Sequence, residues 1–175
     1  MGQEYRIVNA ALSDVGAIAA FQTKCWREAY RGLVPDGYLD GVTEHDRALR
    51  WHERLETGSR DAAIAWSKDA IAGVVSWGPT DSGLPVLELK SLYVGQTHRG
   101  SGLAADLAVR AIGDSSAQLW VFEANLRAQK FYRKLGFSPD GTRKIDPDTS
   151  VWELRFTRAT EDVAWSTLAN PQQGH

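Results

Sequence analysis

The sequence predicts a single α/β domain with a central, twisted, mixed but mostly antiparallel sheet of about seven strands, flanked by about four helices. A chain of 175 residues, 43% of them hydrophobic, is long enough for one well-cored domain and too short for two. Two strand-like runs separated by a hairpin-length turn favour antiparallel pairing. A later strand, helix and strand form a crossover, which joins parallel strands. We assign the domain to residues 1–158 and a C-terminal tail, expected to be partly frayed, to residues 159–175.

The first third of the chain predicts one strand and two helices. Tyr5–Val8 is typical of a strand, and Ser13 is a suitable N-cap for the first helix. The buried face of that helix is expected to carry Val15, Ile18, Cys25, Trp26 and Ala29. Residues 32–42 predict a loop with a short helical piece. Thr43 and Asp46 resemble a weak capping box for the second helix. Its apolar side is expected to carry Leu49, Trp51 or His52, and Leu55.

The middle of the chain predicts a three-stranded meander. Ala62–Trp66 and Ile71–Trp77 should pair as a hairpin, and Val86–Val94 should extend the same sheet. Within that third strand the apolar positions change parity between Leu89 and Leu92. Because successive side chains of a strand point to opposite faces, this change predicts a β-bulge between them.

The last third predicts two helices and three strands. A helix over Ser101–Ile112 and a buried strand over Gln118–Glu123 complete the crossover. Asn125 is suited to cap the next helix. The apolar side chains of that helix are Leu126, Phe131, Tyr132 and Leu135. Phe137–Arg143 and Ser150–Phe156 predict the two final strands.

Composition argues against several classes of partner. A net charge of −2 and a pI near 6.1 give no general attraction to nucleic acid or to anionic membranes. The chain shows no signal-peptide pattern and no apolar run near the roughly 18 residues of a membrane span. Its one cysteine, Cys25, excludes a disulfide framework and fits a reducing cytoplasm. The histidines lack metal-ligand spacing, so we expect no bound metal. Together, the charge, the hydropathy and the single cysteine predict a cytoplasmic protein that binds neither nucleic acid nor membranes.

Residues 87–112 combine a strand, a glycine-rich loop and a helix, which is an anion-binding architecture. The first N–H groups of a helix point outward and carry the positive end of its dipole. Arg99, Gly100, Ser101 and Gly102 would therefore ring an anion such as pyrophosphate, and Arg99 would add a full charge. The loop predicts a cofactor site.

Two other interpretations of this loop exist. Gly100-x-Gly102-x-x-Ala105 also satisfies the dinucleotide-binding fingerprint. Against it, Gly95–Arg99 separates the strand from the fingerprint, and too little chain remains for a second nucleotide-binding half. A Walker loop is excluded because no Gly-Lys-Ser/Thr follows. The other interpretation is a glycine loop that only turns the chain.

Two motifs together resemble those of the GNAT superfamily, the acyl-CoA-dependent N-acyltransferases. Arg99–Ala104 (RGSGLA) is similar to the family's pyrophosphate loop, Q/R-x-x-G-x-G/A, and follows a strand ending in LYV. Asn125–Phe137 is similar to its N-x-x-A-x-x-F-Y-x-x-x-G-F segment. The order of predicted elements matches that fold over roughly residues 5–156, and Trp26–Pro35 resembles, more loosely, a segment of small bacterial members.

The resemblance implies acetyl-CoA as co-substrate. Loop amides would bind the pyrophosphate, and the preceding strand, splayed from Leu119–Phe122, would meet the pantetheine arm through its main chain. Asn125 would bind the pantetheine side or a water, besides capping its helix. The implied cofactor residues are Leu92, Tyr93, Val94, Arg99, Gly100, Ser101, Gly102, Leu103, Ala104, Asn125 and Ala128.

Amide formation needs a neutral amine, donors for the oxyanion and a proton for the departing thiolate. Tyr132 matches the family's general-acid tyrosine, although it could also be an aromatic core residue. Glu88 is a candidate base acting through water, because it faces the side of the sheet opposite its leucine neighbours; the alternative is a solvated strand carboxylate. Trp26, Tyr30 and Tyr38 are implied to line the acceptor pocket, and each could equally be core.

The resemblance implies an N-acetyltransferase that moves an acetyl group from acetyl-CoA to the primary amine of a small molecule, or to a protein N-terminus, through a tetrahedral intermediate. A CoA-binding module without turnover is the alternative, and it would not need Tyr132. A dinucleotide-binding protein is the weaker one. The acceptor stays open, and an exposed edge strand near the C-terminus makes a homodimer plausible.

Overall fold

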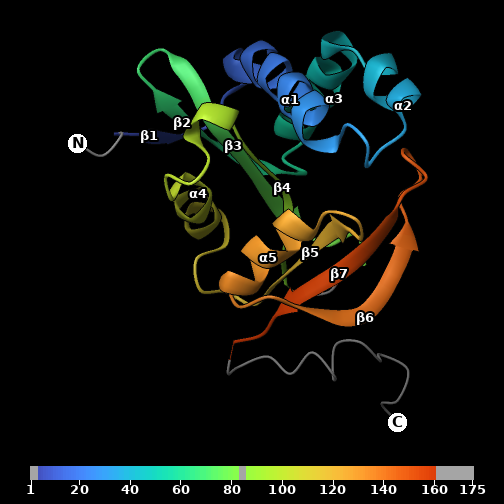
Figure 1. The fold of residues 1–175 in the computed structure, drawn as a ribbon. Coiled ribbons are helices and arrows are strands. Elements are labelled where there is room, and N and C mark those ends of the chain that lie inside the picture. The colour runs from blue at the N-terminus through green and yellow to red at the C-terminus, as the bar shows by residue number, and fades with distance from the viewer. Residues whose placement is uncertain (1–3, 83–85, 161–175) are drawn as a thin grey trace.

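A seven-stranded sheet runs through the protein, as predicted, and the computed structural model describes residues 4–82 and 86–160 of it (Figure 1). The strand order is β1-β2-β3-β4-β5-β7-β6. All neighbours are antiparallel except β4 and β5, which are parallel. The strands are β1 (Arg6–Asn9), β2 (Asp61–Ser67), β3 (Ala70–Pro79), β4 (Leu87–Val94), β5 (Ala117–Phe122), β6 (Ser138–Ile145) and β7 (Trp152–Arg158).

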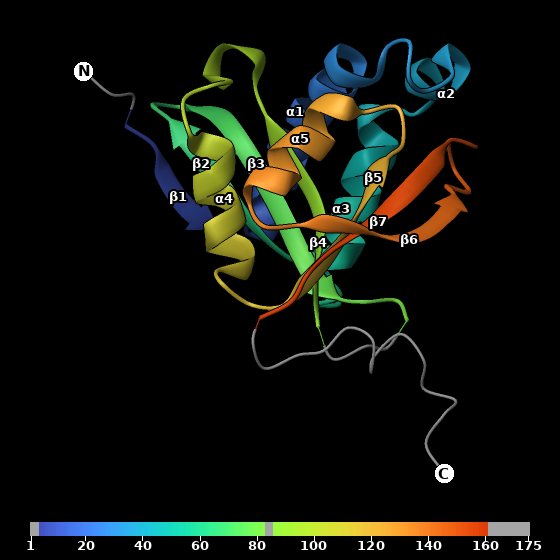
Figure 2. The same ribbon diagram turned by 60° about the horizontal axis from the view of Figure 1, so that its bottom comes forward.

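Helices cover both faces of this sheet. Figure 2 shows α4 and α5 in front of the sheet with α1 and α3 behind it. Both faces of β2 are consequently buried: Ile64 packs with the α1–α3 side, whereas Ala63 packs with the α4 side. The helices are α1 (Val15–Tyr30), α2 (Asp36–Gly41), α3 (Glu44–Glu56), α4 (Leu103–Ile112) and α5 (Leu126–Lys134). Four correspond to predicted helices, and α2 is the short helical piece expected within residues 32–42.

The capping box of α3 is confirmed, but the expected cap of α1 is wrong. The Thr43 hydroxyl accepts the N–H of Asp46 at 3.1 Å, and the Asp46 carboxylate accepts the N–H of Thr43 at 2.9 Å. Ser13 instead lies inside a 3₁₀ turn, Leu12–Asp14, that precedes α1. The Asp14 carboxylate accepts the N–H of Ala11 at 2.8 Å and closes that turn.

Two side chains expected on the inward faces of helices are exposed. Leu49 is 59% exposed and Ala29 is exposed as well, and the apolar Leu126 of α5 is 72% exposed. The buried face of α3 is made by Arg47 and Trp51, one turn apart, which puts Leu49 on the opposite side of the helix. An apolar residue type was therefore a poor guide to the inward face here.

The two inner strands of the sheet separate along their length, as the resemblance implied. β4 and β5 pair only at Leu87 with Ala117 and at Glu88 with Gln118. The predicted bulge of β4 is also present, because Ser91 and Leu89 pair with consecutive residues of β3 and leave Lys90 between them. Beyond Glu88, the edge of β4 that faces β5 is therefore open.

The outermost strand on the C-terminal side is β6, which confirms the predicted edge strand, and all of its residues are exposed. It carries charged side chains and a register shift between Pro139 and Arg143, features that discourage edge-to-edge pairing. Of the described helices, none is both long and apolar enough to cross a membrane. Most of the expected tail, residues 161–175, lies outside the described residues.

Candidate active site

The glycine-rich loop before α4 is shaped as an anion-binding turn. Gly100 and Gly102 adopt left-handed φ angles of +80° and +90°, where glycine is favoured, and a Cβ at either would meet open space. Within the described part of the chain, the N–H groups of Gly100, Gly102 and Ala104 donate to no acceptor. Free amides at the start of a helix form a site for a phosphate group.

Two of the predicted loop residues turn their side chains away from this site. The Ser101 hydroxyl donates to the carbonyl oxygen of His98 at 2.7 Å and accepts from the Tyr5 hydroxyl at 3.1 Å. Leu103 is fully buried in the core under α4. These two residues can therefore contribute to cofactor binding only through their main chain.

A cavity of about 540 Å³ extends from the loop along the open edge of β4, and we call it the loop cavity. Its walls come from β4, the glycine-rich loop, α4, α5 and the end of α1. Nine of the eleven predicted cofactor residues line it: Leu92, Tyr93, Val94, Arg99, Gly100, Gly102, Ala104, Asn125 and Ala128.

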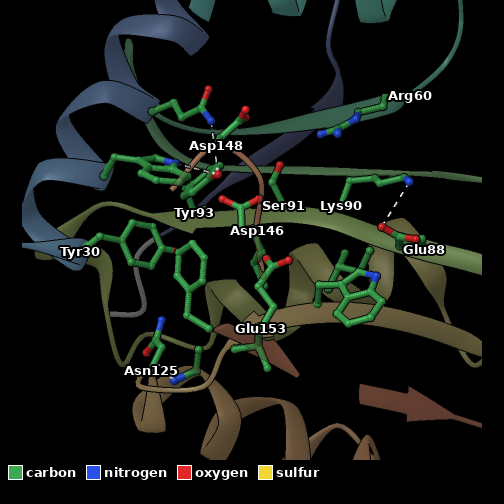
Figure 3. Close-up of a pocket in the computed structure, with 18 of the residues that line it drawn as sticks. Tyr30, Arg60, Glu88, Lys90, Ser91, Tyr93, Asn125, Asp146, Asp148 and Glu153 are labelled. Carbon is green, nitrogen blue, oxygen red and sulfur yellow. Dashed lines mark hydrogen bonds and ion pairs between the residues drawn. The ribbon is translucent and has the colours of Figure 1, made fainter. Parts of the chain in front are cut away.

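A second cavity, of about 280 Å³, lies beside it, and we call it the aromatic cavity (Figure 3). The three aromatic residues predicted for the acceptor pocket, Trp26, Tyr30 and Tyr38, all line it. They also pack on one another, with the ring centroid of Trp26 at 4.6 Å from that of Tyr30 and 5.9 Å from that of Tyr38. A packed aromatic cluster therefore forms the wall of this cavity, and the binding of an acceptor there stays a prediction.

The two cavities meet where β4 and β5 have separated. The residues that line both are Tyr30, Leu92, Tyr93, Asn125, Ala128 and Tyr132. Asn125 caps α5, since its side-chain oxygen accepts the N–H of Ala128 at 3.1 Å, and its amide nitrogen remains available to the cavities. A group bound along the loop cavity would thus face one bound in the aromatic cavity.

Tyr132 stands at this junction. Its ring packs edge-on against Phe131 and Phe137, with centroids 5.2 and 6.2 Å apart, so the core fixes its position. Burial, with a smaller effect from Tyr93, raises the pKa of Tyr132 above that of an ordinary tyrosine. The hydroxyl is consequently protonated at any physiological pH, and it has no hydrogen-bond acceptor among the described residues.

The model of the acetyltransferase (GNAT) family matches residues 23–137, a span that includes the loop and the helix of Tyr132. This chain belongs to the GNAT acetyltransferase family. No curated protein is similar enough in sequence to be matched to it.

Solved GNAT structures share the fold. The PaiA N-acetyltransferase of Thermoplasma acidophilum, in complex with coenzyme A, is 16% identical; the match covers 90% of this chain and 99% of that one with a TM-score of 0.70. YncA of Salmonella typhimurium, a putative acetyltransferase with acetyl-CoA, is 16% identical, with 92% and 96% covered and a TM-score of 0.66. The ribosomal-protein-alanine N-acetyltransferase of Brucella melitensis is 18% identical, with 89% and 99% covered and a TM-score of 0.65.

Glu88 is not the solvated strand carboxylate of the alternative interpretation. It is only 6% exposed, accepts the side-chain N–H of Gln118 at 2.7 Å and lies 3.2 Å from the ammonium nitrogen of Lys90. Glu88 lines the aromatic cavity at the end where β4 and β5 still pair, on the side opposite Tyr30 and Asn125 in Figure 3. Tyr93 lies where the two cavities meet, and five strand positions, or about 16 Å, separate Glu88 from it. A base role for Glu88 would therefore require a long water chain.

Glu153 on β7 is a carboxylate that the sequence analysis missed. It lines the aromatic cavity with 14% of its side chain exposed, and Figure 3 shows it between Glu88 and Asn125. Burial raises its pKa from 4.5 to about 7, helped by Asp146 and Glu88, while Lys144 opposes the increase. The alternation of side chains along β7 predicts on which face of the sheet Glu153 lies. No local sequence pattern shows that this face borders a cavity.

The Tyr93 hydroxyl is a second unpredicted feature, because the resemblance gave Tyr93 only a main-chain role. Its oxygen accepts the indole N–H of Trp26 at 2.9 Å and the amide N–H of Gln22 at 3.3 Å. The other end of the Gln22 amide accepts the indole N–H of Trp51 at 2.7 Å, which fixes its orientation. With two donors on its oxygen, the Tyr93 O–H is directed away from both of them.

Of the described residues, no group of three or more could hold a metal ion. Cys25 on α1 is 3% exposed, and burial raises the pKa of its thiol to about 11. Although Cys25 borders the loop cavity, its thiol therefore stays protonated at neutral pH and is a poor nucleophile.

Proposed function

We propose that the protein is an N-acetyltransferase that moves the acetyl group of acetyl-CoA directly to the primary amine of a small molecule. The observation that carries this proposal is the meeting of the loop cavity and the aromatic cavity at Tyr132. Family membership supplies the reaction class, and two joined cavities suit a reaction that brings two substrates together.

For the cofactor, the free amides of Gly100, Gly102 and Ala104 and the guanidinium of Arg99 would hold the pyrophosphate. Main-chain groups of Leu92–Val94 lie on the open edge of β4 and would bind the pantetheine arm as an added strand does. Asn125 would bind the same arm through its free amide nitrogen.

For the chemistry, we assign Glu153 as the base and Tyr132 as the acid. An amine arrives protonated and must lose a proton before it can attack, and a carboxyl with a pKa of about 7 accepts that proton near neutral pH. Attack forms the nitrogen–carbon bond and a tetrahedral oxyanion, and its collapse breaks the carbon–sulfur bond. Tyr132 then donates its proton to the departing thiolate, directly or through water, and the resulting tyrosinate takes up the second proton that the nitrogen releases as the amide forms. The products are the neutral amide, the CoA thiol and the protonated carboxyl of Glu153, which returns its proton to solvent. Glu88, held by Lys90, is the alternative base.

A CoA-binding module without turnover would need only the loop cavity. Such a module would have no use for the aromatic cavity. The presence of that second cavity therefore favours the enzyme. The volume of about 280 Å³ lies at the lower end of small-molecule pockets, which favours a metabolite over a folded protein as acceptor. We place the activity in a reducing compartment such as the cytoplasm. Sedimentation tests for the homodimer that an edge strand permits, although the charged side chains and the register shift of β6 discourage pairing through that strand.

Two measurements test this function. Isothermal titration should show binding of acetyl-CoA and CoA and no binding of NAD. NAD shares the pyrophosphate group with CoA, but it lacks the pantetheine arm that the edge of β4 would bind. Free-thiol release from acetyl-CoA should depend on an added amine. Binding of NAD as tight as that of CoA would support a dinucleotide site, and CoA binding without amine-dependent thiol release would support the non-catalytic module.

A further inference from the structure

Three arginines line the aromatic cavity without a carboxylate partner among the described residues: Arg47, Arg54 and Arg60. Arg47 is only 4% exposed, and its Nε is enclosed and makes no hydrogen bond. The guanidinium carbons of Arg47 and Arg54 lie 5.0 and 5.9 Å from the ring centroids of Trp26 and Trp51. An aromatic face attracts a cation, but it leaves the forked N–H donors of a guanidinium unused.

Burial acts on all three groups. It lowers the pKa of Arg47 and of Arg60, and it lowers that of Arg54 to about 10. All three remain charged at neutral pH. Arg47 is buried, and Arg54 and Arg60 are half-buried. A buried charge without a partner destabilises a fold, so these three guanidinium groups around one cavity call for an anion that the described chain does not provide.

The carboxylates around the same cavity already have other partners. The ammonium nitrogen of Lys90 lies 3.1 Å from a carboxylate oxygen of Asp81 and 3.2 Å from one of Glu88. Lys144 lies 3.9 Å from Glu153. The two remaining acids, Asp146 and Asp148, contact Thr149 and Arg50. None of these carboxylates is within 4.0 Å of Arg47, Arg54 or Arg60.

The charges are also separated across the cavity. Arg47 and Arg54 come from α3 and Arg60 from the segment that follows it, whereas Glu153 comes from the β6–β7 hairpin. Figure 3 shows Arg60 and Glu153 entering from opposite sides. A molecule with an anionic end and an amine end would match this arrangement, with its amine directed toward Glu153.

We propose that the acceptor is a small amine that also carries an oxyanion, most simply an amino acid, whose anionic group is bound by Arg47, Arg54 and Arg60. This inference rests on the proposed N-acetyltransferase function and names its substrate class. The guanidinium fork binds carboxylate and phosphonate alike, so both are candidate anions.

Matched acceptors test the anion requirement. Thiol release is measured with ten L-amino acids, each paired with its carboxamide, and with the aminophosphonate analogues of two of them. The acids or the phosphonates should exceed their carboxamides at least tenfold in kcat/KM, although the amine of a carboxamide is the less basic of each pair. Equal or faster turnover of the carboxamides overturns the proposal, and the acid-to-phosphonate ratio tells which anion is preferred.

Variants test the residues. Arg47→Gln should lower kcat/KM for the preferred acid about 10- to 100-fold, the usual worth of a charge-assisted hydrogen bond, and leave the carboxamide unchanged. Arg6→Gln removes an exposed arginine of β1 and is the charge-matched control. Because Arg47 has no carboxylate partner among the described residues, its replacement breaks no ion pair and should not lower the melting temperature. A lower melting temperature, with equal losses of kcat/KM for the acid and the carboxamide, would show that Arg47 serves only in packing. If Arg47→Gln misfolds, the kinetic test is repeated with Arg60→Gln.

A binding measurement separates this inference from the proposed function. With CoA present, 3-phenylpropionate should bind in isothermal titration and 3-phenylpropionamide should not, and Arg47→Gln should abolish the difference. If no amine is acetylated but the carboxylate binds in this way, the catalytic proposal fails and the anion site stands. If plain amines are acetylated and the carboxylate does not bind, the anion site fails and the catalytic proposal stands.

Discussion

Replacing Glu153 by glutamine should remove a pH-dependent step from acetyl transfer. The wild-type carboxyl, with a pKa of about 7, is mostly ionised at pH 8, half ionised at pH 7 and only about 1% ionised at pH 5. A positioned base contributes at least about 100-fold, so Glu153→Gln should lose about 100-fold in kcat/KM at pH 8. Each pH unit below 7 removes about tenfold of that advantage, and the two enzymes should be nearly equal at pH 5.

The assay is thiol release at saturating acetyl-CoA from pH 5 to pH 9. The ratio of the two kcat/KM values cancels the ionisation of the amine itself, which both enzymes share. Glu123→Gln removes an exposed carboxylate that does not border either cavity, and it serves as the control. A ratio that is constant with pH, or a pH-dependent ratio for Glu88→Gln in place of Glu153→Gln, would refute the assignment of Glu153.

Further predictions concern stability, the loop and the thiol. Because the pKa of Glu153 is raised from 4.5 to about 7, the free energy of unfolding should fall by about 3 kcal/mol as pH rises from 4.5 to 7. In urea unfolding, Glu153→Gln should therefore be more stable than wild type above pH 7 and no more stable at pH 4. Gly102→Val should abolish CoA binding in titration with native-like circular dichroism; Gly141→Val, with a φ of +88° and equally open space, imposes the same strain on β6 and should keep CoA affinity. Unchanged affinity in Gly102→Val would make the loop a mere turn. Iodoacetamide at pH 8 should not alkylate Cys25 in the folded protein. Mass spectrometry measures the modification, and rapid alkylation would contradict the burial of the thiol.

Features that depend on local spacing could be predicted from the sequence. The left-handed glycines of the loop, the cap at Asn125 and the bulge at Lys90 each follow from a few neighbouring residues. The parallel β4–β5 crossover also follows, because its handedness and direction are general properties of such units.

Features that depend on where distant elements meet could not be predicted. Glu153, Arg47 and the hydroxyl of Tyr93 come from β7, α3 and β4, and only their convergence on one cavity gives them a role. The exposure of Leu49 has the same origin, since the partner helix decides which face of α3 is inward. The ion pair of Glu88 with Lys90 could have been predicted from the sequence, because residues two apart in a strand usually share a face.

The most direct test of the central claim, that acetyl transfer occurs where the two cavities meet, is kcat of Tyr132→Phe with an identified amine, measured beside its CoA affinity. Phenylalanine keeps the packing on Phe131 and Phe137 and removes only the hydroxyl. We predict unchanged CoA affinity and a kcat lower by about 10²- to 10⁴-fold. Because burial keeps this hydroxyl protonated, the loss should be the same at every pH from 6 to 9. A near-wild-type kcat, with the chemical step shown to limit the rate, would mean that Tyr132 does not protonate the thiolate where the two cavities meet.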